Sequence, residues 1–245
     1  MSDEQAGSDG VRAVILAGGK GTRLMPLTEN LPKPLVPVGG LPILEIIVRQ
    51  LRHFGITDLT LSVGHLHGLL ESHFGDGSRW GVSIDYSHEP DPLGTAGPIA
   101  LVERLSDPFL VLNGDLLCSI DYGELIAQHR ASGAMVTIAS YPKEVRIELG
   151  VLETQGDRLT DYVEKPVIPY RVSMGIYAMS PTVLSQIPAG QRFDLPDLIK
   201  RLIADGQRVN LYRFEGYWRD IGTMDEYAVA NDEFQRVRPQ LNIGV

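Results

Sequence analysis

The feature that most constrains this fold is a repeated alternation between short apolar runs and segments of helical periodicity. The runs VRAVILA (11–17), TDLTLSVG (57–64) and FLVLNGD (109–115) are rich in aliphatic and β-branched residues, which is typical of strands buried on both faces. Between the first two runs, residues 41–54 carry apolar side chains at helical spacing. Such alternation predicts a mostly parallel sheet with helices on both faces, so we expect an α/β fold with three layers.

The rest of the chain continues this pattern and then changes character after about residue 145. Further strands are expected at 82–87, 134–140 and 172–180, further helices at about 65–74 and 121–132, and a turn leading into a helix within 92–105. The later part predicts two strands around a turn at 155–157, a helical segment starting at Ser180 and Pro181, a helix at 195–206, two short strands within 207–222 and a final helix at 224–237. With no linker or repeat, we expect one domain over 11–245, preceded by a disordered lead-in at 1–10.

Charge and cysteine content exclude several classes of function. Acidic residues outnumber basic ones by 31 to 22, and the net charge of −9 argues against binding to nucleic acid or to a membrane surface. The single cysteine, Cys118, cannot form an internal disulfide, and it lies in an apolar stretch that predicts a packing role. The acidic start MSDEQAGSDG is unlike a signal peptide, and no apolar run approaches the length of a membrane span. We therefore expect a cytoplasmic protein.

A glycine-rich loop with two cations follows the first predicted strand, in the stretch VILAGGKGTRL (14–24). Gly18, Gly19 and Gly21 allow several backbone N–H groups to converge on an anion, and Arg23 can clamp phosphate oxygens, with Lys20 adding charge. The pattern is neither the Walker loop nor the Gly-x-Gly-x-x-Gly fingerprint. Phosphate binding is the favoured interpretation, and the alternative is a tight turn whose cations only face solvent.

Three other charged residues could belong to the same site. Lys33 lies between two prolines that stiffen its backbone, which suits a fixed counter-charge for a polyphosphate, although a rigid surface loop is the alternative. Asp115 follows a buried strand, where ligands of open α/β sheets bind and where a carboxylate suits Mg²⁺; alternatively it caps the next turn. Asp220 is a candidate second carboxylate, in a stretch whose Trp218 could simply belong to the core.

The triplet EKP (164–166) places a charged pair directly before a proline. A carboxylate such as Glu164 accepts hydrogen bonds from sugar hydroxyls, and a lysine such as Lys165 binds a monophosphate. The alternative is an exposed ion pair, which would contribute little to stability.

Seven stretches together resemble the sugar-phosphate nucleotidyltransferases, also called nucleotide-sugar pyrophosphorylases. They are LAGGKGTRL with Pro26 and Thr28, KPLVPVGGLPIL, PLGTAGP, LNGD, EKP, GIYAMSP and YWRDIGT, in the order of that family and covering nearly all of residues 11–235. The chain looks most like the mannose-1-phosphate and heptose-1-phosphate guanylyltransferase branch. The resemblance implies a GT-A/Rossmann-like α/β/α sandwich with a mostly parallel mixed sheet. It also implies that a nucleoside triphosphate and a sugar 1-phosphate form a nucleotide sugar and pyrophosphate.

The resemblance implies a role for each matching residue. The catalytic set would be Arg23, Lys33, Asp115 and Lys165, with Asp115 and Asp220 holding Mg²⁺. The nucleotide would contact Leu16, Ala17, Gly18, Gly19, Gly21, Thr22, Glu89, Gly94 and Thr95 in the N-terminal half. The sugar phosphate would contact Gly150, Glu164, Lys165 and Ser173, within a second half at about 145–235.

Two departures from the family concern the substrates. Met25 stands where many relatives carry arginine, so one cation of the phosphate loop is missing. Ser173 replaces the asparagine that contacts sugar hydroxyls in hexose-using relatives, which argues against ordinary glucose or mannose.

Glu89 is the residue that bears on the base. It falls where thymidylyl- and adenylyl-specific relatives often have glutamine, and a carboxylate matches the two adjacent donors of guanine. GTP is therefore favoured, with uracil, thymine or adenine nucleotides as alternatives, and Glu89 could instead cap the turn before Pro90. Two other classes are weighed: a non-catalytic regulatory homologue, and a glycosyltransferase, whose usual Asp-x-Asp motif this chain lacks. A homodimer is left open.

Overall fold

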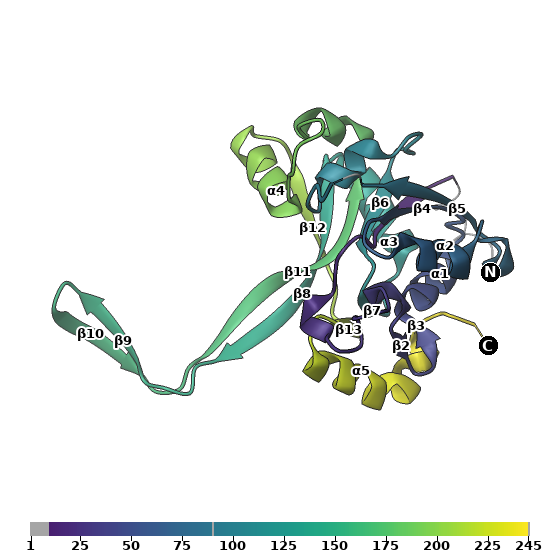
Figure 1. Ribbon diagram of the computed structural model, residues 1–245. Coiled ribbons are helices and arrows are strands. Elements are labelled where there is room, and N and C mark those ends of the chain that lie inside the picture. The colour runs from purple at the N-terminus through teal and green to yellow at the C-terminus, as the bar shows by residue number, and fades with distance from the viewer. Residues whose placement is uncertain (1–9, 90, 245) are drawn as a thin grey trace.

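The computed structural model describes residues 10–89 and 91–244, and the expected lead-in lies outside the described residues apart from Gly10. Its centre is a seven-stranded sheet in the order β12-β8-β11-β6-β1-β4-β5 (Figure 1). The strands are β1 (Arg12–Leu16), β4 (Asp58–Val63), β5 (Ser83–His88), β6 (Phe109–Asn113), β8 (Val136–Arg146), β11 (Val167–Met179) and β12 (Val209–Arg213). Only β11 runs antiparallel to its two neighbours in this sheet, so the sheet is mixed and mostly parallel, as expected.

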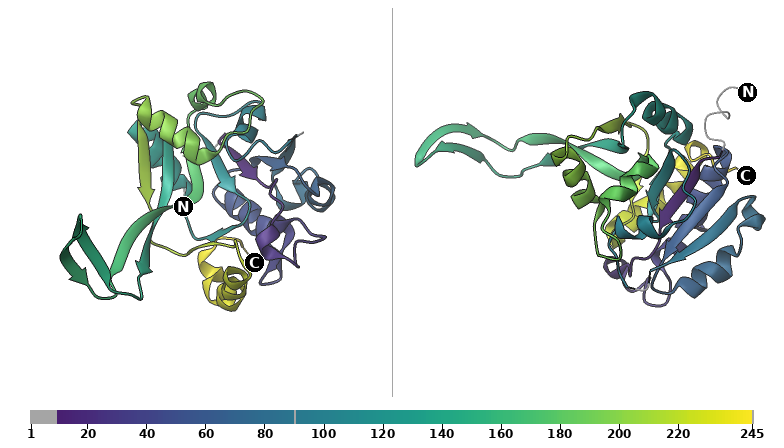
Figure 2. Two further views of the ribbon diagram at one scale, coloured as in Figure 1. Left: turned by 60° about the vertical axis from the view of Figure 1, so that its left-hand side comes forward. Right: turned by 90° about the horizontal axis from the view of Figure 1, so that it is seen from above.

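Helices cover both faces of the sheet. They are α1 (Ile43–His53), α2 (His67–Phe74), α3 (Tyr122–Ser132), α4 (Leu195–Ala204) and α5 (Met224–Val237). Alternate side chains of β1 enter different cores: Ile15 packs with residues of α1 and α3, whereas Val14 packs with residues of α4. The result is the three-layer α/β/α sandwich predicted from the sequence, visible in Figure 2.

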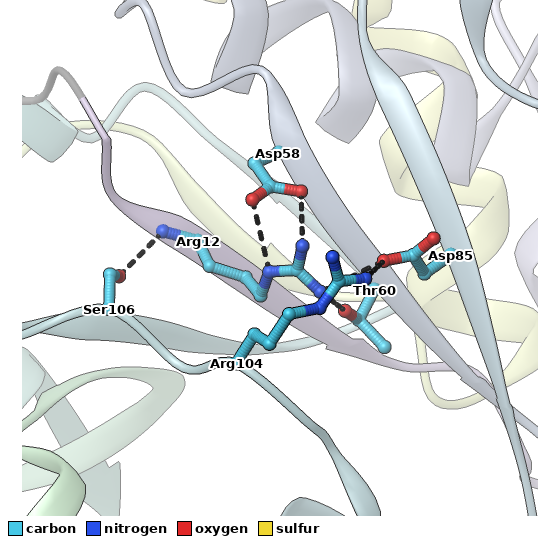
Figure 3. A network of polar contacts seen from close by, with 6 residues as sticks. All are labelled: Arg12, Asp58, Thr60, Asp85, Arg104 and Ser106. Atoms are coloured by element: carbon cyan, nitrogen blue, oxygen red, sulfur yellow. Dashed lines mark hydrogen bonds and ion pairs between the residues drawn. The ribbon is translucent and has the colours of Figure 1, made fainter.

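Arg12 ties together the amino ends of three neighbouring strands (Figure 3). Its guanidinium donates to both carboxylate oxygens of Asp58 on β4, at 2.6 and 3.2 Å, and to Asp85 on β5 at 3.0 Å. A fourth hydrogen bond, of 3.1 Å, reaches Thr60 Oγ1. Because Arg12 is buried and starts β1, this network fixes the strands at the edge of the sheet opposite their carboxyl ends.

Two small sheets lie beside the main one. β7 (Leu116–Cys118) pairs with β13 (Trp218–Asp220), and β2 (Pro37–Val38) pairs with β3 (Leu41–Pro42). In the first of these, Asp220 pairs with Leu116, the residue after Asp115. This pairing carries a late segment of the chain back to the carboxyl end of β6.

A long two-stranded ribbon projects from the body of the protein (Figures 1 and 2). β8 and β11 stay paired beyond the main sheet, from Ser140 and Ser173 to Arg146 and Val167. The ribbon continues into a hairpin of β9 (Val151–Gln155) and β10 (Arg158–Val163). We call residues 141–172 the arm. The sequence predicted the hairpin, but it did not predict that β8 and β11 would extend so far from the sheet.

Two predicted helical segments are short 3₁₀ turns instead. The helix expected after the turn within 92–105 is a 3₁₀ turn at Gly97–Leu101, because the N–H groups of Ala96 and Gly97 both donate to the Phe193 carbonyl and hold its start against another loop. The segment at Pro181–Gln186 ends before Pro188, which disfavours helical geometry in the preceding residue, and Ser180 makes no capping hydrogen bond.

None of the helices within residues 10–89 and 91–244 combines the length and the hydropathy that crossing a bilayer requires.

Candidate active site

The glycine-rich loop and the Asn113-Gly114-Asp115 turn meet where β1 and β6 end. These strands are parallel neighbours, so their carboxyl ends lie at the same edge of the sheet. The Gly114 N–H donates to the Leu16 carbonyl at 2.9 Å. A Cβ on Gly114 would lie 2.9 Å from that same carbonyl oxygen, so only glycine allows this approach. The two segments are thereby locked together.

A cavity of about 240 Å³ opens at this edge of the sheet. Its lining includes eight residues expected at the site: Leu16, Ala17, Gly18, Gly19, Lys33, Glu89, Thr95 and Asp115. A larger cavity, of about 880 Å³, lies between α1 and the turn at 78–81, and none of the candidate site residues lines it. Cavity volume therefore does not point to the candidate site. The candidate residues that line the smaller cavity do.

Lys33 and Asp115, which both line this cavity, form an ion pair. Lys33 is buried in a 3₁₀ turn at Lys33–Leu35, and Asp115 Oδ2 accepts its hydrogen bond. The other oxygen, Asp115 Oδ1, is buried and has no hydrogen-bond partner among the described residues. An unpaired buried carboxylate oxygen is costly unless it has a ligand, so this atom is a candidate cation ligand.

Asp220 faces Asp115 from the neighbouring small sheet. The Ile221 N–H donates to the Asp115 carbonyl at 3.0 Å, which holds the two segments together. Burial and the negative charge of Asp115 raise the pKa of Asp220, while the charges of Lys33 and Arg23 oppose the rise. Two carboxylates held close enough to perturb each other form an oxygen-ligand set that suits Mg²⁺.

Arg23 approaches the same cluster from the loop side. It lies in a 3₁₀ turn at Thr22–Leu24 that begins after Gly21, whose φ of 64° is left-handed. Arg23 and Asp220 line a second cavity of about 480 Å³. Gly21 also packs tightly, since a Cβ there would lie 3.1 Å from Cβ of Lys33. By contrast, Lys20 and Met25 are exposed and line neither of these two cavities.

Glu89 is held in a fixed position against the glycine-rich loop. Its Oε1 accepts from the Ser62 hydroxyl at 3.2 Å, and its Oε2 accepts from the Leu93 N–H at 3.1 Å. A Cβ on Gly18 would lie 2.7 Å from Glu89 Oε1. Because each carboxylate oxygen can accept a second hydrogen bond, Glu89 still has acceptor capacity towards the cavity.

Thr95 and Gly94 are positioned by the start of α4. Asp194 accepts from the Thr95 N–H at 3.0 Å, and the Leu195 N–H donates to the Thr95 hydroxyl at 2.8 Å. Gly94 has a φ of 80°, and a Cβ there would lie 2.6 Å from Asp194 Oδ1. The polar groups of Thr95 therefore already have hydrogen-bond partners, and Thr95 contributes to the cavity mainly by lining it.

The predicted sugar-phosphate residues do not join this cluster within one chain. Gly150, Glu164 and Lys165 all lie in the arm, where Glu164 and Lys165 are exposed. The Tyr162 hydroxyl donates to Glu164 at 3.3 Å, and its ring packs over Gly150. Ser173 lies at the base of the arm, where its hydroxyl contacts that of Tyr177 at 3.0 Å.

Several residues near the cluster were not singled out from the sequence. Tyr141 and Lys143, in the first residues of the arm, line the second cavity with Trp218, and the Trp218 and Tyr141 ring centroids lie 5.2 Å apart. Asn113 packs against Gly175, where a Cβ would lie 2.5 Å from its Nδ2. Only the LNGD stretch gave a signal for Asn113. Nothing in the local sequence indicated Tyr141 or Lys143, because their position depends on the pairing of β8 with β11.

A family model described as nucleotidyl transferase matches residues 12–236. Over 238 residues the chain is 34% identical to a UTP–glucose-1-phosphate uridylyltransferase of Synechocystis sp., covering 89% of this chain and 61% of that protein. Over 233 residues it is 35% identical to a mannose-1-phosphate guanylyltransferase of Mycobacterium tuberculosis, covering 92% of this chain and 65% of that protein. The chain thus spans a little less than two thirds of the length of these relatives.

Among solved structures, the fold is similar to that of HddC from Yersinia pseudotuberculosis. The TM-score is 0.72 at 26% identity, covering 91% of this chain and 99% of that one. A second HddC structure, complexed with GMP-PN, gives a TM-score of 0.70 at 25% identity, with the same coverage of both chains.

Proposed function

The chain belongs to the nucleotidyl transferase family, and we propose that it joins a nucleoside triphosphate to a sugar 1-phosphate. The observation that carries this proposal is the convergence of Lys33, Asp115 and Asp220 beside a glycine-lined cavity. In this proposal the N-terminal half holds the nucleotide, and residues from about 145 to 235 hold the sugar phosphate.

The proposed reaction is an in-line displacement at phosphorus. An oxygen of the sugar phosphate attacks the α-phosphorus and forms a new P–O bond. The bond from the α-phosphorus to the oxygen that bridges to the β-phosphorus breaks, and pyrophosphate leaves with that oxygen and the electron pair. Such a transfer requires positioning and charge neutralisation rather than a protein nucleophile. In this proposal, Lys33 and Arg23 neutralise the charge of the departing pyrophosphate.

Asp115 and Asp220 fit a resident Mg²⁺ ion. The unpartnered Asp115 Oδ1 and the raised pKa of Asp220, caused by burial and by Asp115, both support this assignment. When bound, Mg²⁺ supplies positive charge to the phosphate oxygens. The chain's own part is to hold the two carboxylates at one point, from the turn after β6 and from the end of β13.

GTP is the triphosphate that the site favours. Glu89 lines the nucleotide cavity and keeps two acceptor directions, which match the adjacent N1–H and N2–H₂ donors of guanine. The relative described as a mannose-1-phosphate guanylyltransferase supports the same choice. The alternative is uridylyl, thymidylyl or adenylyl transfer to glucose 1-phosphate, and similarity to the uridylyltransferase favours the first of these.

The sugar is proposed to be a mannose, heptose or cyclitol-type 1-phosphate. Mannose is supported by the relative described as a mannose-1-phosphate guanylyltransferase. Ser173 favours a heptose or cyclitol instead, because its side chain is shorter than the asparagine of hexose-using relatives and its hydroxyl already contacts Tyr177. The acidic chain and its single buried thiol support a cytoplasmic setting without nucleic-acid or membrane partners.

A substrate panel tests this function. Each of the four triphosphates is incubated with mannose, glucose and heptose 1-phosphates, and pyrophosphate release is followed with Mg²⁺ or with a chelator. We expect release with GTP and Mg²⁺ and none with the chelator. Good turnover of another triphosphate alongside inactivity with GTP would reject the base assignment. Nucleotide binding without any release would favour a regulatory homologue.

A further inference from the structure

The arm concentrates exposed apolar side chains within a short segment of the chain. Fifteen large hydrophobic residues are exposed in the described part of the chain, and eight of them lie between residues 145 and 170. Leu149 alone is 73% exposed. An exposed apolar concentration of this kind marks an interaction surface, because soluble proteins rarely leave such a patch uncovered.

The three largest apolar side chains of the hairpin strands share one face, whereas Val163 pairs with Val151 on the other. Leu152 pairs with Tyr162 and Thr154 pairs with Leu159, and residues two apart on a strand share a face. Leu152, Leu159 and Tyr162 therefore form a stripe along one side of the hairpin. A hairpin of two strands is at best marginally stable alone in water, so this stripe needs a covering surface.

The arm also carries Lys165, which does not reach the site of its own chain in this geometry. β11 passes the site at Met174 and Gly175, where the Met174 carbonyl accepts from Trp218 Nε1 at 3.2 Å. From Ser173 to Val167 it pairs continuously with β8 over six residue steps, a span of about 20 Å at roughly 3.3 Å per step. Lys165 lies two residues farther out. Bringing Lys165 back to its own site would break this continuous pairing.

We propose that two copies of this chain exchange arms, so that each arm delivers Glu164 and Lys165 to the sugar-phosphate side of the other copy's site. This inference rests on the proposed function for the role of the two residues. The arm starts beside the site, since Tyr141 and Lys143 line the cavity that also holds Asp220. A second copy presents that same cavity, which is the surface that a sugar-phosphate-binding pair requires.

The exposed area is large enough for such an exchange. The eight arm residues leave the equivalent of about four whole side chains in solvent, or roughly 600–800 Å² per arm at about 150–200 Å² each, close to the roughly 800 Å² per partner of a stable interface. Reciprocal exchange of an identical element also closes the assembly as a two-fold dimer, without a free arm that could recruit further copies.

Complementation between two inactive variants tests the exchange. Asp115→Asn has a defective body and an intact arm, and Lys165→Ala has an intact body and a defective arm. The two are coexpressed with different tags, and mixed dimers are isolated by tandem affinity purification. Exchange in trans gives each mixed dimer one complete site, so we expect about half of the wild-type pyrophosphate release. If each arm served its own chain, every site would carry one lesion and the mixed dimer would be inactive.

A matched pair of variants controls for subunit mixing. Asp115→Asn combined with Lys33→Ala places both lesions in the body, so this mixed dimer must stay inactive. Full activity of Lys165→Ala by itself would also overturn the proposal, because the arm would then deliver no needed residue.

The assembly is tested without reference to activity. We expect wild-type protein to sediment as a dimer and the exposed-stripe variant Leu152→Ser/Leu159→Ser to sediment as a monomer with unchanged circular dichroism. Ile203→Ser, on α4, is the control, since Ile203 is 62% exposed but lies outside the arm, and it should remain a dimer. A monomeric wild type would overturn the exchange. A dimer without any nucleotidyl transfer would instead reject the proposed function alone.

Discussion

Replacing Arg12 by methionine should destabilise the fold strongly without changing the chemistry. Methionine fills similar volume but removes all four side-chain hydrogen bonds that link β1 to Asp58, Thr60 and Asp85 (Figure 3). The Arg12 side chain is only 7% exposed, so the change leaves two carboxylates without their main partner.

The magnitude follows from the unequal burial of the partners. Removing one member of a fully buried ion pair costs about 3–5 kcal/mol. Here the side chains of Asp58 and Asp85 are 47% and 48% exposed, so water restores part of their solvation. We therefore expect the free energy of unfolding to fall by about 2–3 kcal/mol, which for a chain of this size lowers Tm by roughly 5–10 °C.

Urea denaturation measures this loss, with the midpoint falling at an unchanged m-value. Arg104→Ala is the matched control: its side chain is 76% exposed and makes one 3.4 Å contact to the same Asp85, so its cost should stay below about 0.5 kcal/mol. The turnover of folded Arg12→Met should match the wild type, because the site lies at the other end of β1. A loss below about 1 kcal/mol would refute the network as a main tie between the strands.

Three further predictions concern the site and pH. Asp115→Asn should lower kcat at least about 100-fold in a pyrophosphate-release assay, and because it leaves buried Lys33 without its charge partner the urea midpoint should also fall; full activity of the folded variant would contradict the metal assignment. Gly18→Ala would bring a Cβ to 2.7 Å from Glu89 Oε1, so we expect KM for the nucleotide to rise at least about tenfold, with Gly19→Ala, where a Cβ meets no atom within 4 Å, as the control. Burial lowers the pKa of His129, so the unfolded chain binds a proton more readily, and stability should fall as the pH drops below about 6.5. His129→Gln should flatten that slope in urea titrations between pH 7 and pH 5, and an unchanged slope would contradict the assignment.

The sequence predicted that the glycine-rich loop and the turn at Asp115 would meet in the fold, because its signals are local and the fold rule that joins them is general. An apolar run followed by Gly18 and Gly19 identifies a strand and its loop, and a second run ending at Asp115 identifies another. Parallel strands then bring the two ends to one edge of the sheet. No knowledge of distant contacts is needed for that step.

The arm was not predictable for the opposite reason. Pro142 and Pro169 look like strand breakers in sequence, yet each lies in the two-stranded part of the ribbon. There every strand has one unpaired edge, where a missing N–H costs little. The exposed leucines of the hairpin also follow the same alternation as core leucines. Whether such a pattern is covered by its own chain or by another depends on tertiary geometry that the local sequence does not encode.

The regular pairing of β8 with β11 makes the length of the arm an adjustable quantity. Adding two residues to each strand would extend the ribbon by about 7 Å and keep every side chain on its original face, whereas adding one would turn the hairpin's apolar stripe to the other side. The length of the arm can therefore change in steps of two residue pairs if the apolar stripe is to stay on its original face. A protein of this design could match its arm to a wider or narrower spacing between two bodies by small paired insertions, without any change in the strands that position Asp115 and Asp220.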